Sequence, residues 1–87
     1  MDDSEYDRAA TVACNGVGLI GETITVKWIK GTTIVDSATE EVGQGEMWSH
    51  DFEPSPLWAL GTDYKVEIWH GGQLKASATG ISVTNVE

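Results

Sequence analysis

The amino-acid sequence predicts an all-β protein folded as a single antiparallel β-sandwich of six or seven strands. Val, Ile and Thr make up 23 of the 87 residues, against four Leu, and β-branched side chains favour a pleated sheet over a helix. No long stretch keeps a helical period, whereas several short stretches alternate between apolar and polar residues. Short strands separated by glycine-containing turns are typical of sandwiches.

The N-terminal segment is distinguished by its acidity. Four of the 14 acidic residues lie within the first seven positions, namely Asp2, Asp3, Glu5 and Asp7. Because the segment offers almost no apolar surface to bury, we expect residues 1–8 to form an acidic tail and residues 9–87 to form the sandwich domain. The first predicted strand covers residues 9–14, and a glycine-containing connection follows it.

The clearest strand signal lies in residues 22–30, where Ile24, Val26 and Trp28 alternate with polar residues. A period of two predicts a strand with one buried face. The next predicted strand, residues 33–42, alternates poorly because acidic residues interrupt it. This pattern is typical of an edge strand that is protected by charge.

Three more strands are predicted, over residues 46–52, 63–69 and 74–86. We expect the first of them to resume the pairing with 33–42 after a glycine-containing break. A pair of prolines then marks a crossover loop, since proline has no backbone donor. In the last strand the apolar residues change parity at Thr79 and Gly80, which predicts a β-bulge with Gly80 absorbing the extra residue.

The predicted core consists of aromatic and β-branched side chains that share an inward parity. These residues are Trp28, Trp48, Phe52, Tyr64, Val66 and Ile68. Cys14 is the single cysteine, so an intramolecular disulfide is excluded and stability must come from this core.

Two stretches resemble the immunoglobulin-like and fibronectin type III sandwiches. Residues 24–28, Ile-Thr-Val-Lys-Trp, are similar to the early strand of those domains that ends in a core Trp. Residues 60–68, which begin Leu-Gly-Thr-Asp-Tyr, resemble their tyrosine corner, where the phenol bonds to the backbone of the preceding turn. Residues 72–78 resemble the closing hairpin of bacterial and phage immunoglobulin-like modules. The resemblance covers residues 22–86 and implies a binding or spacer module without catalytic residues.

Two of the four tryptophans are the candidate contacts for a partner. Trp69 has outward parity, and Trp58 lies in the predicted crossover loop. An outward Trp can cover a sheet face, anchor a protein interface or stack on a sugar ring. The acidic residues of the tail are the second candidate, because they would be attracted to a basic patch on a partner.

The sequence contains no catalytic motif, and we expect no enzymatic activity, no cofactor and no metal. His50 lies beside Asp51 and Glu53, but no nucleophile stands at a suggestive spacing from it. We expect His50 to point inward with a hydrogen-bonded ring and His70 to lie in a hairpin. The tail acids lack the glycine-containing loop that closes a calcium cage.

The charge balance and the hydrophobic runs exclude further classes of function. Five Lys and Arg against 14 Asp and Glu give a net charge of −9, which is opposite to the cationic surface that nucleic-acid binding requires. No apolar stretch approaches the ~20 residues of a membrane span. The N-terminus has neither the basic start nor the apolar run of a signal peptide, so we expect a protein made in the cytoplasm.

These observations favour a non-catalytic function in protein–protein attachment. We expect an accessory, decoration-type component on a virion or another large assembly, with a capsid or tail protein as partner. One alternative is a carbohydrate-binding module of a microbial surface or secreted protein, which would use Trp58 and Trp69. Another is a spacer module of a longer chain.

Overall fold

The computed structural model describes residues 5–54 and 57–85, and within these ranges it contains seven strands and no helix. The strands are β1 (Glu5–Asp7), β2 (Val12–Val17), β3 (Thr23–Lys30), β4 (Thr33–Glu41), β5 (Met47–Phe52), β6 (Gly61–His70) and β7 (Gln73–Thr84). The all-β class is therefore confirmed.

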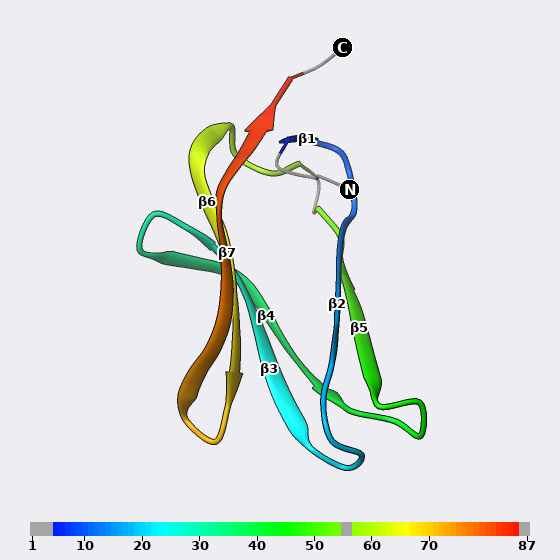
Figure 1. Ribbon diagram of the computed structural model, residues 1–87. Helices are drawn as coiled ribbons and strands as arrows, with labels where there is room; N and C mark the ends of the chain where they lie inside the picture. The colour runs from blue at the N-terminus through cyan, green and yellow to red at the C-terminus, as the bar shows by residue number, and fades with distance from the viewer. Residues whose placement is uncertain (1–4, 55–56, 86–87) are drawn as a thin grey trace.

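The strands form two sheets of very different size. The large sheet has the order β1-β7-β6-β3-β4, and the small sheet consists of β2 and β5. The two sheets enclose the core between them, and the β2–β5 pair and the β6–β7 hairpin diverge toward the lower end of the view (Figure 1). This arrangement is compatible with a β-sandwich.

The large sheet is mixed, which corrects the prediction of a purely antiparallel sandwich. β1 runs parallel to β7, with Glu5 opposite Ser82, whereas the other strand pairs are antiparallel. β1 lies within the segment expected to be a tail. Its anchor is Tyr6, an aromatic residue that packs against the core with its ring edge-on to Trp28, 6.4 Å between centroids.

The predicted pairing of β5 is also corrected. β5 pairs with β2, from Val12 opposite Phe52 to Val17 opposite Met47, and not with β4. The chain after β4 buries Val42 and crosses from the large sheet to the small one. The alternation of apolar and polar residues identified the inward face of β5. It contains no information about which strand pairs with β5, because the same alternation is compatible with several neighbouring strands.

The predicted bulge in the last strand is confirmed. Val66 lies opposite Ala78 and Tyr64 opposite Ile81, so β7 has one more residue than β6 over this interval. Gly80 adopts a φ of +73°, the left-handed conformation that only glycine takes without strain. The shift in parity turns Ile81 inward, where it is buried.

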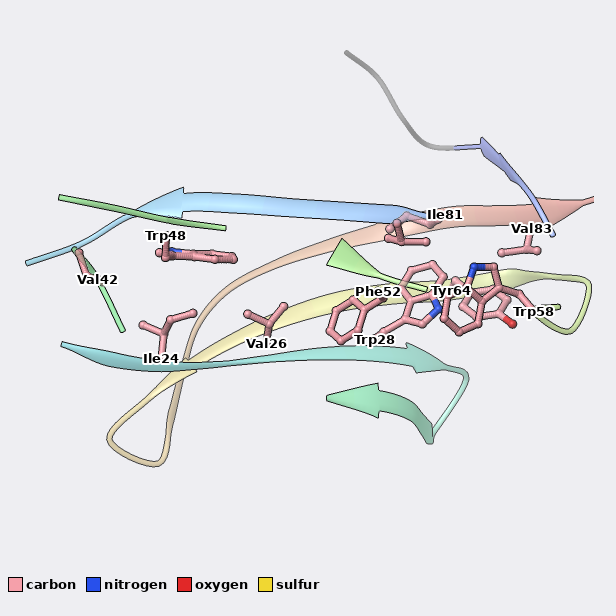
Figure 2. Packing of buried hydrophobic residues seen from close by; sticks show 11 residues of the cluster. Ile24, Val26, Trp28, Val42, Trp48, Phe52, Trp58, Tyr64, Ile81 and Val83 are labelled. Carbon is pink, nitrogen blue, oxygen red and sulfur yellow. The ribbon is translucent and has the colours of Figure 1, made fainter. Parts of the chain in front are cut away.

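The core is centred on Trp28, which is fully buried (Figure 2). Its indole stacks on the Tyr64 ring at 4.5 Å and meets Trp58 edge-on at 5.9 Å. Of the six predicted core residues, Trp28, Trp48, Phe52 and Tyr64 are buried. The remaining two, Val66 and Ile68, pack against the core but are only partly buried, because the two-stranded small sheet does not extend over the whole inner face of the large one.

Candidate functional site

Trp58, predicted to be available to a partner, is a core residue. Its side chain is 7% exposed, and its indole Nε1 donates a hydrogen bond to the carbonyl of Ala10 at 2.9 Å. The backbone N–H of Trp58 also bonds to the carbonyl of Arg8 at 2.9 Å. Trp58 therefore closes one end of the core, whereas its neighbours Leu57 and Leu60 are exposed.

Trp69 lies on the outer face of the large sheet, as its parity predicts, but its own neighbours cover part of it. The Lys27 ammonium group is 4.3 Å from the centroid of the ring, in cation–π geometry. The indole Nε1 donates to the Glu67 carboxylate at 3.0 Å, and Lys65 lies 3.5 Å from the same carboxylate group. Trp58 and Trp69 are thus on different sides of the large sheet and do not form one surface.

The acidic residues of the predicted tail are placed only in part. Glu5 and Asp7 belong to β1, and Asp7 accepts a hydrogen bond from the backbone N–H of Ala9 at 3.0 Å. Asp2 and Asp3 lie outside the described residues. Among the described residues, no group of three or more His, Cys, Asp or Glu side chains is arranged to hold a metal ion.

Among the residues that the structure describes, His50 and Cys14 come nearest to a catalytic arrangement. His50 Nδ1 lies 2.8 Å from a carboxylate oxygen of Glu40, its ring packs edge-on against Phe52, and Cys14 is its direct partner across the β2–β5 pair. These are the residue types of a Cys-His-carboxylate site. However, burial and the nearby Asp51 carboxylate raise the pKa of the Cys14 thiol to about 11, whereas a nucleophilic cysteine needs a lowered pKa. The thiol stays neutral and the imidazole–carboxylate pair joins β5 to the edge of the large sheet.

His70 makes a similar structural contact at the C-terminal end of β6. It is the last residue of that strand and pairs with Gln73 across the β6–β7 turn, which agrees with the predicted hairpin position. Its Nε2 lies 3.5 Å from the Glu22 carboxylate. This pair connects the hairpin to the start of β3.

An uncharged groove opens along the side of the molecule where the small sheet ends. It has a volume of about 480 Å³ and lies between β2 and β7, with Trp48, Val66 and Ile68 forming its apolar part. None of its lining residues is charged, although 22% of the chain is Asp, Glu, Lys or Arg. Four of the lining residues on β7 are small or of moderate size, and two of them, Ala76 and Ala78, are exposed alanines.

A second apolar surface lies at the end of the small sheet, where β2 leads into β3. We define the apolar tip as Val17, Leu19, Ile20 and Met47, whose exposed fractions are 80%, 70%, 53% and 60%. Val17 and Met47 are cross-strand partners, and together with Leu19 they line a shallow hollow rimmed by Glu22 and Glu46.

Sequence reasoning missed both surfaces, although only the groove lacked a signal in the sequence. The groove exists because β2 has no second neighbour among the described residues, and strand pairing cannot be read from alternation. The tip had a visible signal, since Val17, Leu19 and Ile20 are three apolar residues in a glycine-containing connection that a solvated loop does not need.

Comparisons with known proteins do not assign the chain to a family. No protein-family model matches the sequence, and no curated protein matches it closely enough to count as a relative. Within the described residues, no helix is long and apolar enough to cross a membrane.

Proposed function

We propose that the chain is a non-catalytic protein-interaction module that attaches to a larger assembly through the apolar tip. The observation that carries this proposal is the exposure of Val17, Leu19 and Met47 around one hollow, with exposed Ile20 next to Leu19 in the chain. Contiguous exposed apolar residues rimmed by polar groups are characteristic of protein contacts. Isolated apolar residues on a surface would not carry the same argument.

Charge defines the kind of partner that this tip fits. Glu22 and Glu46 rim the hollow, and the chain as a whole carries a net charge of −9. A partner with an apolar patch flanked by Lys or Arg would complement both features, and the opposite charges would accelerate the encounter. The setting we propose is the surface of a virion or a comparable assembly, with a capsid or tail protein as the partner.

The same proposal includes an immunoglobulin-like assignment of the fold. The phenol of Tyr64 donates to the carbonyl of Ala59 at 2.7 Å, which is the bond of a tyrosine corner. The order β7-β6-β3-β4 in one sheet and β2-β5 in the other corresponds to the G-F-C-C′ and B-E neighbours of an immunoglobulin variable-type sandwich. A fold of this kind serves many functions, so the functional argument depends on the tip.

A sugar-binding function is less well supported. A sugar platform requires aligned exposed aromatic rings, and Trp58 is buried while Lys27 covers part of Trp69. A spacer module does not need a binding surface, so the spacer alternative gives the exposed apolar tip no role.

Co-sedimentation of the protein with particles of its native assembly tests the proposal. We expect the wild-type chain to travel with the particles and Leu19→Asp to lose most of this association. Ile34→Asp is the matched control, because Ile34 is also exposed, at 53%, but lies in the β3–β4 hairpin away from the tip. A wild-type chain that stays monomeric and never travels with particles would contradict attachment, and equal association of both variants would contradict the role of the tip.

A further inference from the structure

The strand edges of this fold differ in how they are protected from pairing with another chain. An exposed edge presents unpaired backbone N–H and C=O groups, and proteins normally protect it with charges, bulges or shortness. β4 carries Asp36, Glu40 and Glu41 together with a register shift. β7 carries Lys75 and register shifts along its length. β1 has only three residues, two of them acidic.

β2 has none of these protections. Its six residues, Val-Ala-Cys-Asn-Gly-Val, include no charge and no proline. Its pairing with β5 is regular over all six positions, so its opposite edge is straight. β5, the other strand of the small sheet, is partly protected on its outer side, where His50 bonds to Glu40 of β4. Among the described edges, β2 alone is long, regular and uncharged.

The groove lies next to this unprotected edge. The large sheet extends past β2 as far as β7, so the inner face of the β6–β7 hairpin has no strand over it among the described residues. Ile68 and Val66 are therefore only partly buried, and Ala76 and Ala78, their partners on β7, are exposed. A strand added beside β2 would bury these four side chains.

The extension of the large sheet past β2 determines what can occupy the groove. A second copy that paired its own β2 antiparallel to this one, about a two-fold axis perpendicular to the small sheet, would bring its own β7 into the layer that β7 already fills, because in each copy the large sheet extends past β2. Two copies, each with a net charge of −9, would also repel each other. A single extended segment has neither problem, since it brings no second layer.

We infer that the groove binds one extended segment of a partner protein, which adds to the free edge of β2 as a third strand of the small sheet. Backbone hydrogen bonds to β2 would provide the affinity, and alternate side chains would point toward Ile68, Ala76 and Ala78. Because the lining is uncharged and presents the small residues Ala76 and Ala78 to the incoming strand, these alternate residues are apolar and of the size of Val or Ile. Basic residues at the ends of the segment would match the acidic chain.

Synthetic peptides test this inference directly. The probe is a ten-residue peptide in which Val and Thr alternate between terminal lysines, and its isomer with the valines contiguous is the composition control. Two readouts report on the groove, namely hydrogen exchange of the β2 amides and the reaction of Cys14, which lines the groove, with a disulfide reagent. We expect the alternating peptide to slow both, and the isomer to affect neither.

Two variants on β7, one inside the groove and one outside it, locate the binding. Ala78→Lys places a charge in the groove and should weaken peptide binding by at least about tenfold, a loss of ~1.4 kcal/mol. Gln73→Lys on the same strand, where Gln73 pairs with His70 and lies outside the groove lining, should change affinity by less than about twofold. Thermal unfolding of both variants checks that they fold, and since Ala78 is exposed we expect both to do so.

Three outcomes would overturn the inference. The first is no protection of β2 by the alternating peptide at concentrations up to about 1 mM. The second is equal binding by the isomer or by Ala78→Lys, which would mean apolar adhesion or another site. The third is protection of the β2 amides from hydrogen exchange in the absence of peptide, increasing together with the amount of dimer seen in sedimentation. That result would make a second copy the occupant of the groove. Leu19→Asp should bind the peptide like wild type, so either proposal can fail without the other.

Discussion

Replacement of Tyr64 by Phe isolates one hydrogen bond in the centre of this fold. Tyr64 is 1% exposed, and its hydroxyl donates to the carbonyl of Ala59 at 2.7 Å, a normal length for an O–H···O bond. The substitution removes only the hydroxyl oxygen. The ring keeps its stack on Trp28, 4.5 Å between centroids, so cavity formation contributes little.

The expected cost is about 1 kcal/mol of unfolding free energy. A neutral intramolecular hydrogen bond contributes roughly 0.5–1.5 kcal/mol net, and a larger penalty arises only when the abandoned partner stays buried. Ala59 is exposed, so water can replace the phenol at its carbonyl. For a domain of this size the loss corresponds to a decrease in Tm of about 4–8 °C.

Urea denaturation measures this cost with the slope of the transition as an internal check. We expect the midpoint to fall by roughly 0.5–1 M, with an unchanged m value. Tyr64→Leu is the comparison variant, and because it also removes the aromatic stack it should cost several times more. A neutral Tyr64→Phe variant would show that the bond to Ala59 does not stabilise the fold, and a loss above about 3 kcal/mol would show that the ring itself had moved.

The pH dependence of the same pair provides a second check. Burial and the adjacent Asp63 carboxylate raise the pKa of Tyr64 above its ordinary value, against a smaller lowering by the bond to Ala59. The unfolded chain therefore loses the phenolic proton at a lower pH than the folded chain, and wild-type stability falls as the pH rises through 10 and above. The variant lacks this group, so the difference between the two proteins should shrink over that range.

Three other experiments test separate parts of the structure. Gly16→Ala should lower the free energy of unfolding, measured by urea denaturation, by about 1–3 kcal/mol, because the added Cβ would lie 2.7 Å from the Trp48 indole. Gly43→Ala should be nearly neutral, because a Cβ at this position meets nothing within 4 Å. Gly80→Ala should cost about 1 kcal/mol through its positive φ alone, and an unchanged midpoint would argue against the bulge. Cys14 should react with a disulfide reagent at pH 8 roughly tenfold more slowly in the folded chain than in urea. The raised pKa lowers the fraction of thiolate, and this effect outweighs the greater nucleophilicity of a high-pKa thiolate. Equal rates in the two states would contradict the burial of Cys14.

Local sequence patterns were sufficient to predict six of the seven strands, all but β1, and the bulge. The alternation of Ile24, Val26 and Trp28 reports which side of β3 is buried, and all three residues are buried. The parity change around Gly80 likewise reports a feature of one strand. Both depend on neighbours in sequence, because side chains alternate between the two faces of a strand with a period of two.

Strand neighbours and loop burial depend on contacts that are distant in sequence, and these could not be predicted. β5 has the same inward residues whether it pairs with β4 or with β2, so its pattern does not distinguish the two. Tyr6 is one aromatic residue among acids, and its packing against Trp28 becomes visible only when β7 is placed beside it. Trp58 has no periodicity to read, because it lies in a loop, and its burial follows from the position of Ala10, 48 residues away.

The candidate site follows from the unequal width of the two sheets. Large side chains, including Trp28, Trp48 and Phe52, lie where both sheets are present and are buried. Beyond the free edge of β2, where the large sheet continues, the exposed residues of β7 that line the groove include Ala76 and Ala78. Alanine exposes little apolar area to water while the groove is empty. It also leaves space for the larger side chains of an incoming strand, so the same small residues suit both the open state and the filled one.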